Sequence, residues 1–346
     1  MTTMAEVAKQ AGVSMTTVSH VLNGTRRVNE KTIARVHAAI ERTGYRPNSI
    51  ARALAGARTR SIGVAMSGIS NPYFMDVISA IEAEAANHGY ALLLADTHDE
   101  PDKELRMVQE LVLRQVDGLV LAPAPDAHMR TLDYLATAGV PAVLVDRFVP
   151  AGIDQVGTEN ERPTATLVKH LADLGHSRIA IVAGLHGLST TEERVRGYRA
   201  GLHESGLPVD DALIESARIP YVPADDAIGR LLSGSNPATA LVVGSNSMTI
   251  RVLRALRERG LSVPRDIALV GFDDFEWSDL FQPRLTVIAQ PTRDIGAKAI
   301  ELLLSRLDDR DREPQSLRLP ATFVHRESCG CKAQGDRGPR TVVPAA

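Results

Sequence analysis

The sequence has few cysteines, few aromatic residues and no long apolar run. Only two cysteines occur among 346 residues, Cys329 and Cys331, which excludes a disulfide framework and fits a reducing cytoplasm. The longest apolar runs, such as YALLLA at 90–95, are far shorter than a membrane span, so we expect no membrane partner. The first ten residues, MTTMAEVAKQ, lack the apolar segment of a secretory signal, and we expect no export.

The two cysteines stand in a Cys-Gly-Cys segment near the end of the sequence. Two thiols without a nearby histidine pair are too few to hold a metal ion, so we expect free thiols and no metal site. No Ser-His-Asp arrangement, metal cluster or phosphate-binding G-x-x-x-x-G-K-[ST] loop is present, which argues against an enzyme. We expect no cofactor.

Positive charge is concentrated at the start of the chain. Residues 1–60 hold ten Lys and Arg against three acidic residues, a net charge of +7. The whole chain carries −3, so the remaining 286 residues carry −10. A basic head on an acidic body indicates a polyanionic partner for the head, although a solvated surface would also explain a charge run.

The first 45 residues predict three short helices. One spans 4–11, a second begins after an N-cap at Ser14 and runs through Leu22, and a third extends from Asn29 to Gly44. Only about three residues separate the first two helices, which is typical of a helix-turn-helix.

The second of these helices carries the groups that can reach a base edge. Val18, Val21 and Leu22 fall on one face and pack inward. The positions left facing outward are Met15, Thr16, Thr17, Ser19 and His20, with Arg26 and Arg27 just beyond the helix. The second helix of a helix-turn-helix enters the major groove, where these side chains can hydrogen-bond or contact bases. An ordinary surface histidine is the alternative for His20.

Residues 46–60 predict a short helix followed by a linker. Pro47 ends the preceding helix, and Asn48 or Ser49 can cap about two further turns. A helix this short is marginal alone in water.

From residue 61 the sequence predicts an α/β body. Continuous apolar runs separated by helix-length segments indicate buried parallel strands in two doubly wound lobes, parting near 147–160 and crossing again near 290. The expected strands are 61–66, 90–95, 117–122, 141–146, 178–183, 239–244, 266–272 and 285–290. A ligand would bind in the cleft between the lobes. The Pro/Gly-rich stretch 333–346 reads as a disordered tail.

The head resembles a known family. MAEVAKQAGVSMTTVSHVLNG, followed by VNEKTIARVHAAIERTGYRPNSIARAL, is similar to the DNA-binding head of LacI/GalR (lactose-repressor) regulators, and the resemblance continues through the body. It implies a helix-turn-helix domain over 1–46, a hinge helix and linker over 47–60, and a two-lobed sugar-binding and dimerisation domain over 61–332. It also implies a homodimeric repressor of sugar uptake or catabolism genes that binds near-palindromic operator double-stranded DNA.

The resemblance assigns roles within the head. Met15, Thr16 and His20 fall on base-reading positions, and Leu54 corresponds to a leucine that wedges into the minor groove. Packing of Leu54 on the body is the alternative from the residues alone. Under the wedge interpretation Leu54→Ala keeps sugar binding and loses most operator affinity, because an apolar wedge unstacks and bends the duplex. Ala55 departs from the lysine that relatives often have there.

The body resembles ribose-type periplasmic sugar-binding proteins. The implied effector-binding residues are Asn71, Tyr73, Phe74, Asp146, Arg147, Arg194, Tyr221, Asn246, Asp273 and Gln290. Such a set favours a neutral pentose or hexose. Each sugar hydroxyl both donates and accepts a hydrogen bond, and carboxylates, guanidinia and amides supply the matching acceptors and donors. Ser247 and Arg251 depart from the pattern, and we assign them to lobe packing. A sugar-binding transport component is the alternative function, which the basic head and the missing signal disfavour.

Overall fold

The computed structural model describes residues 3–23, 26–45, 58–126, 128–216, 224–233, 235–331 and 340–342, and the statements below concern these. The chain divides into two compact units, Met1–Thr59 and Arg60–Ala346, and each is treated by itself. The expected hinge helix with Leu54, and the expected effector residue Tyr221, lie outside the described residues.

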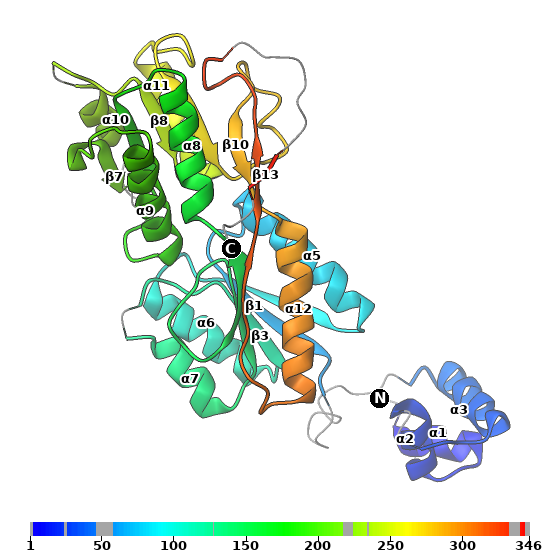
Figure 1. Cartoon of the computed structure of the whole chain (residues 1–346). Helices are drawn as coiled ribbons and strands as arrows, with labels where there is room; N and C mark the ends of the chain where they lie inside the picture. Colours follow the sequence, from blue (N-terminus) through cyan, green and yellow to red (C-terminus); the bar gives the residue numbers. More distant parts are fainter. Residues whose placement is uncertain are drawn as a thin grey trace. The chain divides into compact units, whose positions relative to one another are not determined.

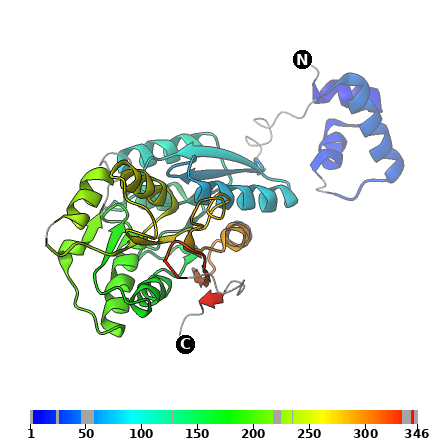
Figure 2. The same ribbon diagram turned by 90° about the horizontal axis from the view of Figure 1, so that it is seen from above.

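The N-terminal unit contains three described helices (Figure 2): α1 (Met4–Ala11), α2 (Met15–Asn23) and α3 (Glu30–Thr43). Thr3 and Glu6 form a capping box at the start of α1, and Gly12 ends α1 at φ 61°, a left-handed conformation that glycine tolerates without steric cost. Three residues separate α1 from α2, as predicted. The helix-turn-helix prediction is confirmed.

A small apolar core holds the three helices together. Its fully or nearly fully buried members are Val7, Ala8 and Ala11 of α1, Val18 of α2, and Val36 and Ala39 of α3. Arg35 of α3 fixes the turn, because its Nη2 donates to the carbonyl oxygens of Ala11 (2.5 Å) and Gly12 (3.2 Å). The first residues of α2 are therefore held in one orientation relative to the core.

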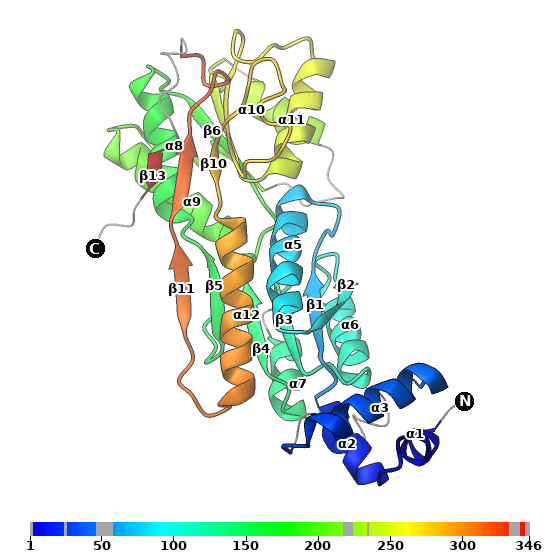
Figure 3. The ribbon, with the colours of Figure 1, turned by 90° about the vertical axis from the view of Figure 1, so that its right-hand side faces the viewer.

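The first lobe of the body is built on a parallel sheet of the order β11-β5-β4-β3-β1-β2. Figure 3 labels all six strands, and Figure 1 labels β1 and β3. Its strands are β1 (Ser61–Met66), β2 (Ala91–Asp96), β3 (Gly118–Leu121), β4 (Ala142–Val145), β5 (Asp154–Thr158) and β11 (Ser316–Leu319). Its helices are α5 (Pro72–Asn87), α6 (Pro101–Leu113), α7 (Arg130–Ala138) and α12 (Thr292–Asp308).

The second lobe is built on a sheet of the order β13-β12-β10-β9-β8-β6-β7. Its strands are β6 (Ile179–Ala183), β7 (Ile214–Ser216), β8 (Ala240–Val243), β9 (Ala268–Phe272), β10 (Thr286–Ala289), β12 (Ala321–Val324) and β13 (Arg340–Val342). Its helices are α8 (Glu161–Asp173), α9 (Ser189–Glu204), α10 (Ala224–Leu232) and α11 (Asn246–Glu258), with a short 3₁₀ turn, η1 (Asp211–Leu213). The strands pair in parallel except β12 and β13, which pair antiparallel to their neighbours.

All eight predicted strands are present, and the two-lobed α/β fold is confirmed. The chain crosses between the lobes after β5, after β10, and again between β11 and β12 (Figure 3). The third crossing was not predicted, because β11 is a half-exposed edge strand that includes Arg318 and lacks a continuous apolar run.

The expectation of a structureless tail over 333–346 is wrong at Arg340–Val342. These three residues form β13, in antiparallel register with Ala321–Phe323 of β12. Backbone pairing at a sheet edge requires little from the side chains, so composition alone does not reveal it. In the described part of the chain, no helix combines the length and the apolar character needed to cross a membrane.

Candidate ligand cleft and nucleic-acid interface

A cavity of about 570 Å³ lies between the lobes, where the carboxyl ends of their parallel strands meet. This volume is in the range of small-molecule sites. The predicted effector residues on its wall are Asn71, Tyr73, Phe74, Asp146, Arg147, Arg194, Asp273 and Gln290. The structure therefore brings together eight of the ten residues that the sequence assigned to the ligand.

The amino end of α5 forms one part of the wall. The Asn71 side chain caps this helix by accepting a hydrogen bond from the Tyr73 backbone N–H (3.0 Å). The Tyr73 hydroxyl donates to Asp146 Oδ1 at 2.8 Å. Burial raises the pKa of Asp146, and burial together with the Asp146 charge holds the pKa of Tyr73 well above its usual value. Tyr73 is thus a donor that occupies one oxygen of Asp146.

Arg147 is almost completely buried beside it. Its Nη1 donates to Asp99 Oδ1 (2.5 Å) and to the Pro123 carbonyl oxygen (2.9 Å). Its Nε lies 3.5 Å from Asp146 Oδ2 and makes no hydrogen bond within the described residues. A buried donor without a protein partner is costly, so this nitrogen is free to donate to a polar group in the cavity.

Arg194, on α9, enters from the second lobe. Its Nε donates to Asn160 Oδ1 at 2.9 Å, its Nη1 donates to the Gly244 carbonyl oxygen, and its Cζ lies 3.7 Å from the centre of the Phe272 ring. These contacts fix the plane of the guanidinium before a ligand arrives. A planar group held in this way can recognise two neighbouring oxygen atoms at once.

Asp273 and Gln290 complete the wall of the second lobe. Gln290 Nε2 donates to Asp273 Oδ1 (2.6 Å), and the backbone N–H of Asn246 donates to Asp273 Oδ2 (3.2 Å). Gln290 Oε1 is buried and accepts no hydrogen bond from the described residues. Asn246 is fully buried and is not part of the cavity wall. Its contact with Asp273 makes it a positioning residue in this conformation.

Several cavity residues were missed by sequence reasoning: Asp96, Asp99, Thr190, Thr191, Arg254 and Trp277. Asp96 ends β2, so the rule that ligands meet strand ends could have found it. Trp277 is the single tryptophan of the sequence, which is a weaker signal. The assignment of Ser247 and Arg251 to lobe packing is wrong, because both line the cavity. They lie on the first turns of α11, which begins at the cleft.

The described surface of α2 is consistent with its expected role. Met15 is 54% exposed, Thr16 and Arg26 are exposed, and His20 is half-buried, whereas Val18 is 0% exposed and faces the core. Thr17 is half-buried, and its Oγ1 lies 2.9 Å from Ser14 Oγ at the start of the helix. Apolar and hydroxyl groups are therefore exposed at the amino end of α2, the part that reads bases in this motif.

The expectation that the two cysteines lack nearby histidines is wrong. The fold places His170 and His325 beside Cys329 and Cys331. The sequence could not reveal this, because His170 belongs to α8 and is far away along the chain.

A helix-turn-helix unit joined to a two-lobed ligand-binding unit defines a DNA-binding regulator with a periplasmic-binding-protein-like domain. Residues 3–48 match the family described as bacterial regulatory proteins, lacI family, and residues 168–329 match the periplasmic binding protein-like domain. The chain is 34% identical to catabolite control protein A of Priestia megaterium, over 94% of this chain and 98% of that protein.

A second relative and a solved structure agree with this family. The ribose operon repressor of Escherichia coli (strain K12) is 32% identical over 95% of this chain and 100% of its own length. The structure of the lac repressor dimer bound to operator and the anti-inducer ONPF superimposes with a TM-score of 0.81, at 28% identity, covering 95% of this chain and 99% of that one. The chain therefore belongs to the lacI family. It is a DNA-binding transcriptional regulator, not an enzyme.

Proposed function

We propose that this regulator is a homodimeric repressor of sugar uptake or catabolism genes, controlled by a neutral pentose or hexose in the cleft. The observation that carries the proposal is the balance of charge around the cavity. Four aspartates and four arginines line it: Asp96, Asp99, Asp146, Asp273, Arg147, Arg194, Arg251 and Arg254. A neutral ligand leaves this balance of charge unchanged, and sugar hydroxyls both donate and accept.

The aromatic side chains support the same ligand class. Tyr73, Phe74 and Trp277 border the cavity beside these charged groups. Apolar ring faces pack against the C–H face of a sugar, while the charged groups reach its hydroxyls. The name of the ribose operon repressor supports the choice of a monosaccharide.

The DNA-binding part of the proposal rests on α2. Met15, Thr16, Thr17 and His20 would contact bases, and Arg26 would contact a phosphate or a base. Leu54 as a minor-groove wedge, and the division into 1–46, 47–60 and 61–332, remain parts of the proposal that rest on the family resemblance. The related lac repressor is a dimer on its operator, which supports a homodimer on a near-palindromic site. A DNA-binding regulator acts where the chromosome is, so we propose a cytoplasmic location.

The test is isothermal titration of the purified full chain with a panel of monosaccharides and sugar phosphates. We expect at least one neutral monosaccharide to bind, and Arg194→Ala to weaken that binding at least tenfold, because it removes charged hydrogen bonds. Arg196→Ala is the matched control. It lies on the same helix, is exposed, and pairs with Glu161 at 3.1 Å. If every neutral monosaccharide fails to bind, or if only sugar phosphates bind, the proposed effector is wrong.

Selection of DNA from a random pool tests the DNA-binding part of the proposal. We expect recovery of a near-palindromic sequence whose affinity changes when the sugar is added. A transport component would bind the sugar equally well but would select no DNA sequence.

A further inference from the structure

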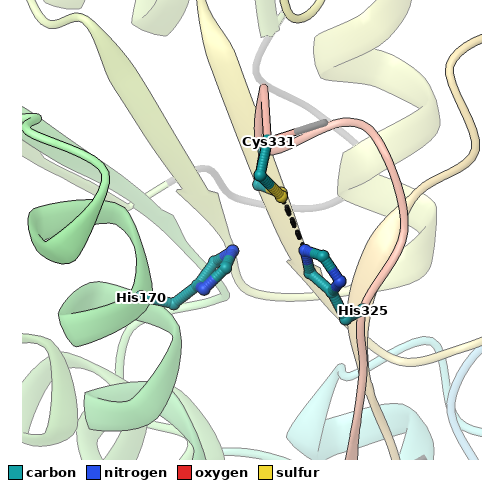
Figure 4. A group of neighbouring side chains, drawn as sticks. His170, His325 and Cys331 are labelled. Atoms are coloured by element: carbon teal, nitrogen blue, oxygen red, sulfur yellow. Dashed lines mark hydrogen bonds between the residues drawn. The ribbon is translucent and has the colours of Figure 1, made fainter. Parts of the chain in front are cut away.

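Four potential metal ligands converge in the second lobe, and none of them lines the ligand cleft. His170 lies near the end of α8, His325 directly follows β12, and Cys329 and Cys331 lie in the loop that comes next. One ligand atom from each residue lies within 4.8 Å of all the others. Figure 4 shows His170 facing His325 and Cys331 across this space.

The spacing of the donor atoms is unusual for uncoordinated side chains. Cys329 Sγ lies 2.7 Å from Cys331 Sγ, and His325 Nε2 lies 2.6 Å from Cys331 Sγ and 3.5 Å from Cys329 Sγ. A zinc ion bound at about 2.3 Å by two thiolates in a tetrahedron separates the sulfur atoms by about 3.8 Å. Opening the thiols by roughly 1 Å, which side-chain torsions allow, creates room for an ion among four donors.

One donor has no other role in the described structure. Nε2 of His170 is buried and has no hydrogen-bond partner among the described residues. The ring packs edge-on against His325 and Phe323, with ring centres 5.2 Å apart in both pairs. A buried ring nitrogen without a partner is costly, and a coordinated metal would satisfy it.

The loop that carries the cysteines is held rigidly on the sheet. Ser328 is fully buried: its carbonyl accepts from the Leu269 N–H (2.8 Å) and its hydroxyl donates to the Leu269 carbonyl (2.6 Å). Arg326 is paired with Asp274 at 2.9 Å. Gly330, at φ 87°, makes the left-handed turn between the cysteines. The backbone that carries the cysteines is therefore fixed before any metal binds, and only the side chains have to adjust.

We propose that His170, His325, Cys329 and Cys331 form a structural Cys₂His₂ site for a zinc ion. Binding replaces two thiol protons, released to solvent, by one Zn²⁺, so the coordinated group is neutral overall. Neutrality suits the site, because Cys329 is fully buried and the other three residues are partly buried. All four ligand positions come from the protein, which is the arrangement of a structural rather than a catalytic zinc site.

The consequence is a link between two distant segments of the chain. The ion would fasten the segment after β12, which follows the third crossing between the lobes, to α8, which follows the first crossing. Closing so long a loop restricts the unfolded chain strongly, and a ligand that binds only the folded state raises its stability. The site would stabilise the second lobe by joining the carboxyl-terminal part of α8 to the segment that follows β12.

The metal content of the full chain tests the proposal. The protein is purified in the presence of reductant, without chelator and with any affinity tag removed, and its metals are measured by mass spectrometry. We expect about one zinc per chain, and a cobalt-substituted protein with the visible bands of a tetrahedral ion and a near-ultraviolet thiolate charge-transfer band. Removal of the metal should lower Tm by several degrees, and added zinc should restore it.

Variants assign the ligands. His170→Gln and Cys331→Ser, at partly buried positions, should each lower zinc content and weaken zinc affinity at least tenfold. His203→Gln is the control, since it is exposed on α9 and should retain one zinc. Circular dichroism checks that the variants are folded. The proposal is wrong if reduced protein binds no zinc or cobalt, if the Cys331→Ser protein keeps full zinc affinity, or if thiol titration and mass show a Cys329–Cys331 disulfide.

Discussion

Asp146 and Asp273 occupy matching positions in the two lobes. Asp146 directly follows β4 and Asp273 directly follows β9, and their φ angles are 66° and 75°. Residues other than glycine rarely adopt positive φ, and such strain is concentrated at functional sites. Both side chains are buried at the cavity wall, so each lobe places one carboxylate there from a strained strand end.

The first prediction concerns the pH dependence of effector binding. Burial raises the pKa of Asp146, so this carboxyl group takes up a proton at higher pH than an ordinary aspartate. A protonated carboxyl group accepts hydrogen bonds poorly. We therefore expect sugar affinity to be constant above the raised pKa and to fall, by up to about tenfold per pH unit, as the pH drops through it. Calorimetric titration across this pH range measures the effect.

Asp146→Asn separates this group from the other titrating residues. The variant should bind the sugar more weakly at neutral pH and should lose this pH dependence. Asp133→Asn, exposed on α7, should behave as the wild type. An unchanged pH profile in Asp146→Asn would assign the dependence to another group.

The second prediction concerns the contact of α8 with α9. A Cβ on Gly197 would lie 2.1 Å from the carbonyl oxygen of Glu161 and 2.9 Å from Thr164 Cβ, so an alanine must push α9 away from α8. Overpacking of this kind costs about 1–3 kcal/mol, which outweighs the better helix propensity of alanine. Because Arg194 lies one turn earlier on α9, we expect both a lower Tm and weaker sugar binding.

Gly152→Ala provides the control for this substitution. Beyond its two chain neighbours, no heavy atom of the described residues lies within 4 Å of its added Cβ. Thermal unfolding and calorimetry on both variants decide the matter: equal behaviour of Gly197→Ala and Gly152→Ala would contradict the packing argument.

The third prediction concerns base recognition by α2. Thr16→Ala removes an exposed hydroxyl and a methyl group from the amino end of this helix. Loss of a base-edge contact is worth about 1–3 kcal/mol, so we expect affinity for the selected operator to fall about tenfold or more. Binding to unrelated DNA should hardly change, because phosphate contacts dominate it. Gel-shift titrations at fixed salt measure both, with His37→Ala, exposed on α3, as the control.

The fourth prediction concerns communication between the lobes. Arg318 of β11 donates to both carboxylate oxygens of Glu193 on α9, at 2.6 and 3.0 Å. Glu193 accepts from Asn160 Nδ2 (2.9 Å), and Asn160 Oδ1 in turn accepts from Arg194 Nε. A chain of hydrogen bonds thus joins the first lobe to the proposed effector arginine.

Breaking this chain should reduce the coupling between sugar and operator. We expect Arg318→Ala to lower the ratio of operator affinities measured without and with sugar severalfold, because coupling energies of about 1–3 kcal/mol depend on such networks. Lys298→Ala, on α12, where the lysine pairs only with the neighbouring Glu301 in the described structure, should leave the ratio unchanged. An unchanged ratio in Arg318→Ala would show that the coupling runs elsewhere.

Local signals in the sequence predicted much of this protein. Ser14, Asn29 and Gly44 cap α2 and α3 where the sequence indicated, because a cap depends on residues within one turn. Seven of the eight predicted strands were recognisable because they are buried almost throughout and therefore continuously apolar. The eighth, β2, is a largely half-exposed edge strand that was recognised from its apolar run alone. The strands that escaped prediction, β5, β7, β11, β12 and β13, are polar, short or at sheet edges, where pairing relies on backbone groups.

The sequence predicted where the cleft lies, at the ends of the parallel strands, but only some of the residues that line it. Strand ends that carry Asp146, Asp273 and Asp96 follow a rule that holds for every doubly wound sheet. Whether a side chain near a strand end enters the cleft depends on the packing of its helix, which is why Asn246 lies behind the wall while Arg251 lies on it.

By itself, the sequence determined the helix-turn-helix, the two lobes and the class of residues at the cleft, since each follows from interactions over a few residues or from burial patterns repeated along the chain. Only the tertiary structure decided which distant side chains meet. His170 approaches Cys329 and Cys331 because α8 packs against the sheet that carries β12. The pairing of Arg318 with Glu193 likewise requires the third crossing between the lobes. Contacts of this kind depend on how whole helices and strands pack against one another. The residues next to each partner in the sequence do not show which distant side chain it will meet.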